Sequence, residues 1–178
     1  MEEFLEKSYY WELERKDKLN AAAAFPVGLS AICANLIYFS LTNNHTSGLT
    51  NFIINTFIIM SSFCLAMSII AGFEFFAGFQ YKYVGKAEEF AHWMDELVAH
   101  SARFQDAPDP KVTFLVELTR SFARSADHNA ANNDRKSTLL YWMNTFVGAS
   151  LALALCGSGI VALSNGSSSK IEQVNVYG

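Results

Sequence analysis

The sequence predicts an all-α membrane protein with three transmembrane helices and a cytoplasmic helical hairpin between the second and the third. The first observation is that apolar residues gather into three long runs, at 21–41, 52–73 and 139–163, with polar residues between them. Such segregation is typical of membrane proteins. The second is that run 52–73 carries no charge. At about 1.5 Å per residue, a run of this length spans a hydrocarbon core of ~30 Å.

Residues 1–20 are predicted to form a cytoplasmic amphipathic helix. Apolar residues such as Phe4, Tyr9 and Leu13 recur at roughly helical spacing among charged residues. Two interpretations stay open for this helix. It packs on the cytoplasmic part of the protein, or its aromatic residues lie at the lipid headgroup surface.

The first transmembrane helix is expected at 21–41, followed by an external polar turn at 42–51. Pro26 lies near the helix start, where its missing N–H costs least. Gly28 and Ala31 belong to a stripe of small residues that lets another helix approach closely. Asn35 lies at mid-depth, and we expect it to face a neighbouring helix because an amide in lipid is costly.

The second transmembrane helix is expected at 52–73. Asn55 lies within it, and Glu74 directly follows it. A carboxylate at a membrane boundary can mark an ion path. It can also extend into headgroup water, which is the interpretation we favour for Glu74.

Residues 74–138 are expected to form the cytoplasmic helical module. Within it, residues 86–104 show the clearest amphipathic helix of the chain, with apolar side chains at i, i+3, i+4 and i+7: Phe90, Trp93, Met94 and Leu97. This stripe either docks a cytoplasmic protein or packs on the helix that follows Pro110. The opposite face carries His92, Glu96 and His100 at four-residue spacing. It lacks a fourth ligand, so we interpret it as a solvated face and expect no metal and no cofactor.

The segment QDAPDP interrupts the module, and Asp109 followed by Pro110 is a typical helix start, with Asp as N-cap and Pro at the first helical position. The polar stretch DHNAANNDRKS at 127–137 is either a helical extension of the third span or a loop. Asparagine is a poor helix former. We favour a helix, while the sequence leaves open whether residues 111–163 form one continuous helix.

The third transmembrane helix is expected at 139–163, and residues 164–178 are expected to be an external flexible tail. Asn144 is a candidate for hydrogen bonding between helices. Small residues form a nearly continuous stripe along the span, at Gly148, Ala152, Cys156 and Gly159. This stripe is the strongest signal for helix–helix contact in the sequence.

The basic residues predict the topology. Twelve of the thirteen Lys and Arg residues precede the first apolar run or lie between the second and the third, and Lys170 is the other one. Since cytoplasmic segments of membrane proteins are enriched in Lys and Arg, the N-terminus and residues 74–138 are expected in the cytoplasm.

Several functional classes are disfavoured. No P-loop, dinucleotide-binding, nucleophile-elbow or zinc-protease motif is present, so we do not expect an enzyme. A net charge of −4 does not favour nucleic-acid binding. The three cysteines lie one in each apolar run and are expected to be apolar fillers. The charged N-terminus indicates no signal peptide, so the first run is expected to remain as an anchor.

Two stretches of the chain carry a resemblance. YYWELERKDKLNAAAAFPVG leads a charged helix into a span with an early proline, and DHNAANNDRKSTLLYW is a polar run that enters the last span. This layout resembles small bacterial inner-membrane proteins of anti-phage (abortive-infection) systems. The resemblance implies a membrane effector that is quiet until a cytoplasmic sensor acts on it, and that then oligomerises and disturbs the bilayer. It assigns no catalytic or binding residue.

Three functional hypotheses follow. The first is an oligomerising inner-membrane effector that disrupts the bilayer or forms a pore, with the lipid bilayer and further copies of the chain as its partners. The second is a membrane anchor or sensor subunit that docks a cytoplasmic protein on its helical module. The third is a small ion channel or carrier subunit, with Asn35, Asn55, Glu74 and Asn144 as its polar contacts.

Overall fold

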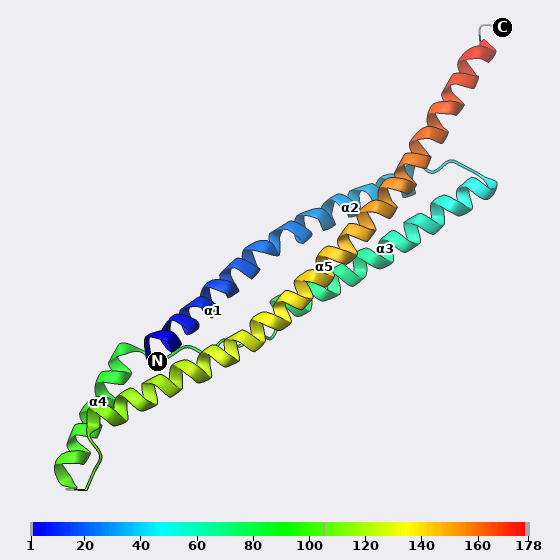
Figure 1. Cartoon of the computed structure of the whole chain (residues 1–178). Helices are drawn as coiled ribbons and strands as arrows, with labels where there is room; N and C mark the ends of the chain where they lie inside the picture. The colour runs from blue at the N-terminus through cyan, green and yellow to red at the C-terminus, as the bar shows by residue number, and fades with distance from the viewer. Residues whose placement is uncertain (1, 105, 177–178) are drawn as a thin grey trace. The chain divides into compact units, whose positions relative to one another are not determined.

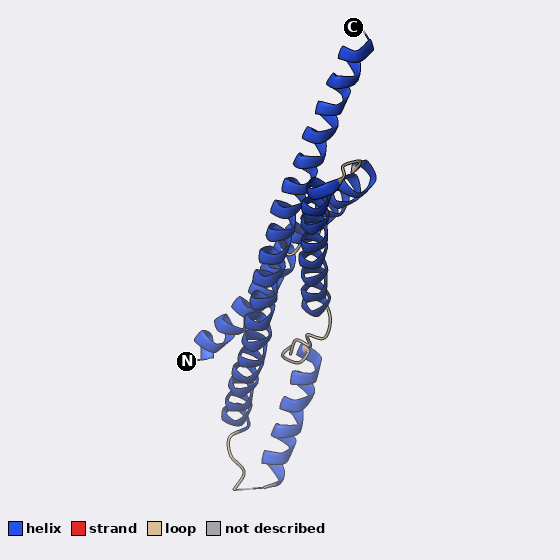
Figure 2. Cartoon of the chain, turned by 90° about the vertical axis from the view of Figure 1, so that its right-hand side faces the viewer, coloured by secondary structure: helices blue, strands red, loops and turns tan. Residues whose placement is uncertain are grey.

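A computed structural model describes residues 2–104 and 106–176, with side chains for residues 3–86, 88–104 and 106–165. This part of the chain contains five α-helices and no strand (Figures 1 and 2). The helices are α1 (Glu2–Ala22), α2 (Ala24–Asn43), α3 (Gly48–Phe76), α4 (Ala87–Arg103) and α5 (Pro110–Val176). The predicted all-helical class is confirmed.

The chain forms two compact units. One comprises Met1–Asn20 and Phe79–Lys136, and we call it the polar unit. The other comprises Ala21–Gly78 and Ser137–Gly178, and we call it the apolar unit. Helix α5 contributes residues to both units.

Three helical stretches are long and apolar enough to cross a membrane. They lie within Glu3–Asn43, Gly48–Phe76 and Pro110–Asn165. The three apolar runs of the sequence fall inside these stretches, so the prediction of three candidate membrane-spanning helices is confirmed.

The helices extend beyond the apolar runs on both sides of the predicted external turn. The non-helical segment is residues 44–47, where the sequence predicts a turn at 42–51. At the end of α2, the side chains of Thr42 and Asn43 bond carbonyls one turn back in the same helix. The Asn44 side chain accepts hydrogen bonds from the N–H and the hydroxyl of Thr46, a local motif that favours a turn. Gly48, at a φ of +67°, then begins α3.

The core of the apolar unit lies between α2, α3 and α5, with one buried cluster formed by Ile37, Ile54, Ile58, Ala154 and Val161. Where α3 meets α5, the packed residues follow an alternating three- and four-residue spacing and form a seam. On α3 the seam contains Ile54, Ile58, Ser61, Leu65, Ser68, Gly72 and Phe75. On α5 it contains Met143, Val147, Ser150, Ala154, Gly157 and Val161. This spacing keeps one face of each helix turned toward its partner, as in coiled coils. Phe75, which follows the predicted end of the second span, also lies in this core.

Small side chains and hydroxyl groups bring the two helices close together. The Ser61 hydroxyl donates to the Ser150 carbonyl at 2.8 Å, and the Ser150 hydroxyl donates to the Ser61 carbonyl at 2.9 Å. Two turns further along, the Ser68 hydroxyl donates to the Met143 carbonyl. Hydroxyl–backbone bonds and small residues are typical of helix packing in membranes, where the hydrophobic effect does not drive helices together. Cys33 of α2 packs on α5, with its sulfur 3.8 Å from the Val147 carbonyl oxygen.

Helix α5 begins as the sequence predicts. The Asp109 carboxylate accepts a hydrogen bond from the Lys111 N–H at 2.8 Å, and Pro110 is the first helical residue. The stretch at 127–137 is helical, and no break interrupts α5 between residues 111 and 163. The helix also continues to Val176, where the sequence predicts a flexible tail. The Asn165 amide donates to the Asn43 carbonyl and ties this part of α5 to the end of α2.

Candidate functional site

The linker at residues 79–86 is non-helical and is bound along the asparagine-rich face of α5. The Asn129 side chain makes two hydrogen bonds to the backbone of Lys82. Its oxygen accepts from the Lys82 N–H, and its NH2 group donates to the Lys82 carbonyl, each at 2.9 Å. His128 and Asn132 both contact the Gln80 carbonyl at 2.8 Å. An extended segment has no internal backbone bonds, so these side chains supply partners for its backbone polar groups.

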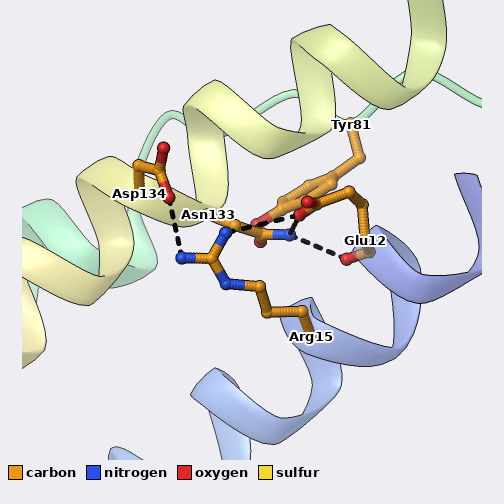
Figure 3. A network of polar contacts seen from close by, with 5 residues as sticks. All are labelled: Glu12, Arg15, Tyr81, Asn133 and Asp134. Carbon is orange, nitrogen blue, oxygen red and sulfur yellow. Dashed lines mark hydrogen bonds and ion pairs between the residues drawn. The ribbon is translucent and has the colours of Figure 1, made fainter. Parts of the chain in front are cut away.

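Asn133 joins the linker, α1 and α5 in a second polar network (Figure 3). Its side-chain oxygen accepts from the Tyr81 hydroxyl at 2.7 Å. Its amide donates to the Glu12 carbonyl at 2.7 Å and to the Glu12 carboxylate at 2.8 Å. Arg15 lies beside that carboxylate at 3.6 Å and binds Asp134 at 2.7 Å (Figure 3). Asn129 and Asn133 have no exposed surface, so their amides are structural and not solvated.

Burial and neighbouring charges perturb two groups near this network. Burial, together with Tyr83 and Glu12 nearby, raises the pKa of the Tyr81 phenol above its ordinary value. Tyr81 is therefore a neutral hydrogen-bond donor at physiological pH. Burial and the neighbouring Lys16 ammonium lower the pKa of Lys136.

A row of alternating aromatic rings and cations runs along the linker. Lys16 lies 5.1 Å from the centre of the Tyr81 ring and 5.7 Å from that of Tyr83. Lys136 lies 5.5 Å from the Tyr81 ring and 5.4 Å from the Phe79 ring. Arg135 lies 5.6 Å from the Phe79 ring. These distances are within the range of cation–π interactions. We call this set the aromatic–cation row: Lys16, Phe79, Tyr81, Tyr83, Arg135 and Lys136.

The asparagine anchors and the aromatic–cation row are not predicted from the sequence. The pattern at 127–137 predicts a helical extension of the third span or a loop, without a docking role. One signal was present: Asn129 and Asn133 stand four residues apart. They continue the three- and four-residue spacing that Met143 and Val147 follow further along α5. In the linker, aromatic residues at every second position indicate an extended segment with one aromatic face.

The small residues predicted at helix–helix interfaces all lie on exposed faces of α2 and α5. This applies to Gly28, Ala31, Gly148, Ala152, Cys156 and Gly159. A Cβ atom added at Gly28, Gly148 or Gly159 would meet nothing within 4 Å. Packing within the chain uses the other face of α5, which carries Ser150, Ala154 and Gly157.

The four polar residues considered for a pore are not brought together. Asn35, Asn55, Glu74 and Asn144 are all exposed, and no hydrogen bond or ion pair within the described residues joins any two of them. Asn55 bonds Asn51 in its own helix, and Asn144 bonds the Leu140 carbonyl in its own helix. Glu74 lines a hollow of about 320 Å³ whose other lining residues are apolar: Met67, Ile70, Ala71, Leu139, Trp142 and Phe146.

The apolar stripe of α4 packs against the start of α5. The Phe114 ring lies 6.0 Å from Phe90 and 5.2 Å from Trp93, centre to centre. Phe90, Trp93, Met94 and Leu97 are all half-buried. The packing on α5 therefore covers the stripe only in part. Beside it is an open cavity of about 360 Å³, lined by Lys82, Phe90, Trp93, Glu117, Ser121, Arg124 and Ser125.

The polar face of α4 lies in solvent. His92 and Glu96 are exposed, with their side chains 3.7 Å apart. Within the residues that the structure describes, no group of three or more His, Cys, Asp or Glu side chains could hold a metal ion. Cys33 is buried, Cys64 is half-buried and Cys156 is exposed, and all three are free thiols.

Comparison of the chain with protein-family models, curated proteins and solved structures gave no match.

Proposed function

We propose that this chain is a bacterial inner-membrane protein that self-associates in the bilayer and then disturbs it, as a pore or disruptive effector of a defence system. The N-terminus and residues 74–138 lie in the cytoplasm in this proposal. The distribution of Lys and Arg supports that orientation. The resemblance to anti-phage membrane proteins supports bilayer disturbance as the activity.

The observation that carries the proposal is the exposed small-residue face of α5. Gly148, Ala152, Cys156 and Gly159 follow one another along this face, and the packing of the apolar unit leaves them exposed. Faces of this kind let helix backbones approach closely in a membrane, where van der Waals contact drives association. The interior face of α5 already serves the contact with α3, so the exposed face is available to another chain.

Exposed asparagines support the same proposal. Asn144 stands at one end of the small-residue face of α5, and Asn35 stands on the same face of α2 as Gly28 and Ala31. An amide that faces hydrocarbon without a partner costs free energy, and a second copy of the chain would supply the partner. Two such faces on one molecule allow head-to-tail contacts, which form a ring when the rotation between neighbouring copies closes.

The test is leakage of a trapped dye from liposomes that contain the purified chain. If the active species is an assembly, leakage rises more steeply than in proportion to the protein-to-lipid ratio. The double variant Gly148→Leu, Ala152→Leu places large side chains where two copies of the chain would approach closely. It is therefore expected to abolish leakage while still inserting into the bilayer. Ala66→Leu is the matched control, since Ala66 is an exposed small residue on α3. Equal leakage from the double variant, or none from the unmodified chain, would refute the proposal.

A membrane anchor or sensor subunit is the second candidate. The half-covered stripe of α4 and the cavity beside Trp93 favour it, because both leave apolar surface for a cytoplasmic protein. This candidate predicts a stoichiometric soluble protein bound to the chain.

A further inference from the structure

The aromatic–cation row concentrates positive charge within the polar unit. Lys16 and Arg135 form no ion pair with a carboxylate anywhere in residues 3–86, 88–104 and 106–165. Asp134, the acid next to Arg135 in sequence, binds Arg15. Lys136 is buried, and its ammonium donates to the Asn20 side chain at 2.9 Å.

The cations of the row repel one another. Lys16 and Lys136 lie on the same Tyr81 ring, and the charge of Lys16 contributes to the lowered pKa of Lys136. Like charges held this close are unfavourable unless an anion offsets them. The rings stabilise the ammonium groups in part but carry no net charge. The Glu12 and Asp17 carboxylates act on the same Tyr81 phenol. Neither forms an ion pair with Lys16 or Arg135 within the described side chains, so these two cations remain for a bound anion.

Hydrogen-bond donors remain at the row for such an anion. Lys16 has three N–H donors and gives one to the Tyr83 hydroxyl oxygen at 3.1 Å. The Tyr83 side chain is exposed, so its own O–H is available to a ligand. Arg135 is exposed and presents a planar guanidinium, whose geometry suits bidentate binding of phosphate.

The members of the row stand next to the ends of the candidate membrane spans. Lys16 comes five residues before Ala21, where the apolar unit begins, and Phe79 directly follows Gly78, where its first segment ends. Lys136 directly precedes Ser137, where its second segment begins. Aromatic and basic residues at the ends of spans meet the headgroup layer, and the cytoplasmic leaflet is the anionic one.

We propose that Lys16, Arg135 and Lys136, with the Tyr83 hydroxyl, bind the headgroup phosphate of an anionic phospholipid. Lys16 and the Tyr83 hydroxyl, which lie together, contact the phosphate oxygens, and Arg135 and the buried Lys136 contribute their charge. The site binds a lipid at the point where the linker and α1 meet α5 in the polar unit. This inference rests on the membrane placement proposed above but not on self-association.

The test is the lipid that stays bound to the full chain. The chain is reconstituted in nanodiscs of equal phosphatidylglycerol and phosphatidylcholine, extracted gently, and its bound lipids are counted by native mass spectrometry. We expect phosphatidylglycerol to be enriched. Lys16→Gln and Arg135→Gln should each weaken that enrichment about five-fold, the effect of one basic residue near an anionic surface. Lys16→Arg keeps the charge and should retain the enrichment.

Lys18→Gln is the matched control, because Lys18 is exposed two residues away and pairs with Glu14 at 2.8 Å. It should leave the enrichment unchanged. Equal loss in this control would mean a diffuse surface charge and would overturn the site. Unchanged enrichment in the Lys16 and Arg135 variants would overturn it too. If millimolar inorganic phosphate displaces the lipid, the site binds soluble phosphate and the assignment to a headgroup is wrong. Insertion of each variant is measured separately by flotation, so a failure of membrane placement is distinguishable from loss of the site.

Discussion

Replacing Asn129 with Leu should release the linker from α5. The Asn129 side chain makes both of its hydrogen bonds to the Lys82 backbone, at 2.9 Å each, and it has no exposed surface. Leu has the same branched arrangement of heavy atoms and a better helix propensity, so α5 itself should persist. The substitution leaves the Lys82 N–H and carbonyl without these partners.

The magnitude follows from the two lost bonds. A typical hydrogen bond contributes ~1 kcal/mol net, and an unsatisfied buried partner costs about 1–3 kcal/mol. We therefore expect docking of the linker to weaken by about 2–3 kcal/mol, because part of the penalty is relieved when the freed backbone reaches water. That corresponds to a change of roughly 30- to 150-fold in the docking equilibrium.

Hydrogen exchange at the Val84 amide of the linker measures this change, because this amide donates to the Tyr9 hydroxyl and not to the substituted residue. In the variant, exchange should accelerate by the same factor, because the amide is protected only while the linker is docked. Asp127→Leu is the matched control, since Asp127 is exposed two residues earlier on α5. Unchanged protection of Val84 in Asn129→Leu would show that the asparagine does not anchor the linker, and the interpretation of the polar unit would be wrong.

Two further predictions concern single hydroxyl groups. Ser61→Ala removes the donor to the Ser150 carbonyl. Steric-trapping measurements in bicelles should show the apolar unit destabilised by about 0.6–1.7 kcal/mol, as for other hydrogen bonds between membrane helices. No loss of stability would mean that the serine pair is only a packing contact. The raised pKa of Tyr81 means that neutral Tyr81 stabilises the fold fully below the ordinary tyrosine pKa of about 10, and that this stabilisation is lost as the pH rises toward the folded-state pKa. Tyr81→Phe should therefore lower the stability of the fold at neutral pH, because the hydrogen bond to Asn133 is lost. The decline of stability at alkaline pH should be smaller in the variant than in the unmodified chain. An identical decline in both would exclude Tyr81 as the cause of the alkaline loss of stability.

The sequence predicts the membrane helices well because the length of an apolar run and its lack of charged residues determine whether it can span a bilayer. Residues 52–73 contain no charge, and any continuous apolar run of that length favours a spanning helix. Helix ends are less well determined, since local bonds set them. The second span is predicted to end at residue 73, whereas α3 continues to Phe76. Phe75, in this added part of the helix, lies in the core.

The faces of the helices are harder to predict than the helices themselves. Small residues occur on more than one side of α5, since Ser150, Ala154 and Gly157 alternate with Gly148, Ala152 and Cys156. Composition alone does not decide which side packs within the chain, because both sides permit close approach. The structure places the first set in the seam with α3 and leaves the second set exposed.

The polar unit was least predictable because its contacts join distant segments. Asn129 binds Lys82 across 47 positions of sequence, and Asn133 binds Glu12 across 121. A polar side chain has the same identity in solvent and in a buried network, and only its partners distinguish the two. The helix at 127–137 could be predicted, whereas its role as the docking face for the linker could not.

Self-association in the bilayer is the central claim, and the native mass of the tagged chain in lipid particles tests it most directly. We predict a closed ring of at least about four identical chains, since small subunits usually build a central path through symmetric closed assemblies. The double variant Gly148→Leu, Ala152→Leu should dissociate this ring. A monomer or dimer that carries a stoichiometric soluble protein would contradict the claim and would identify the chain as a membrane anchor.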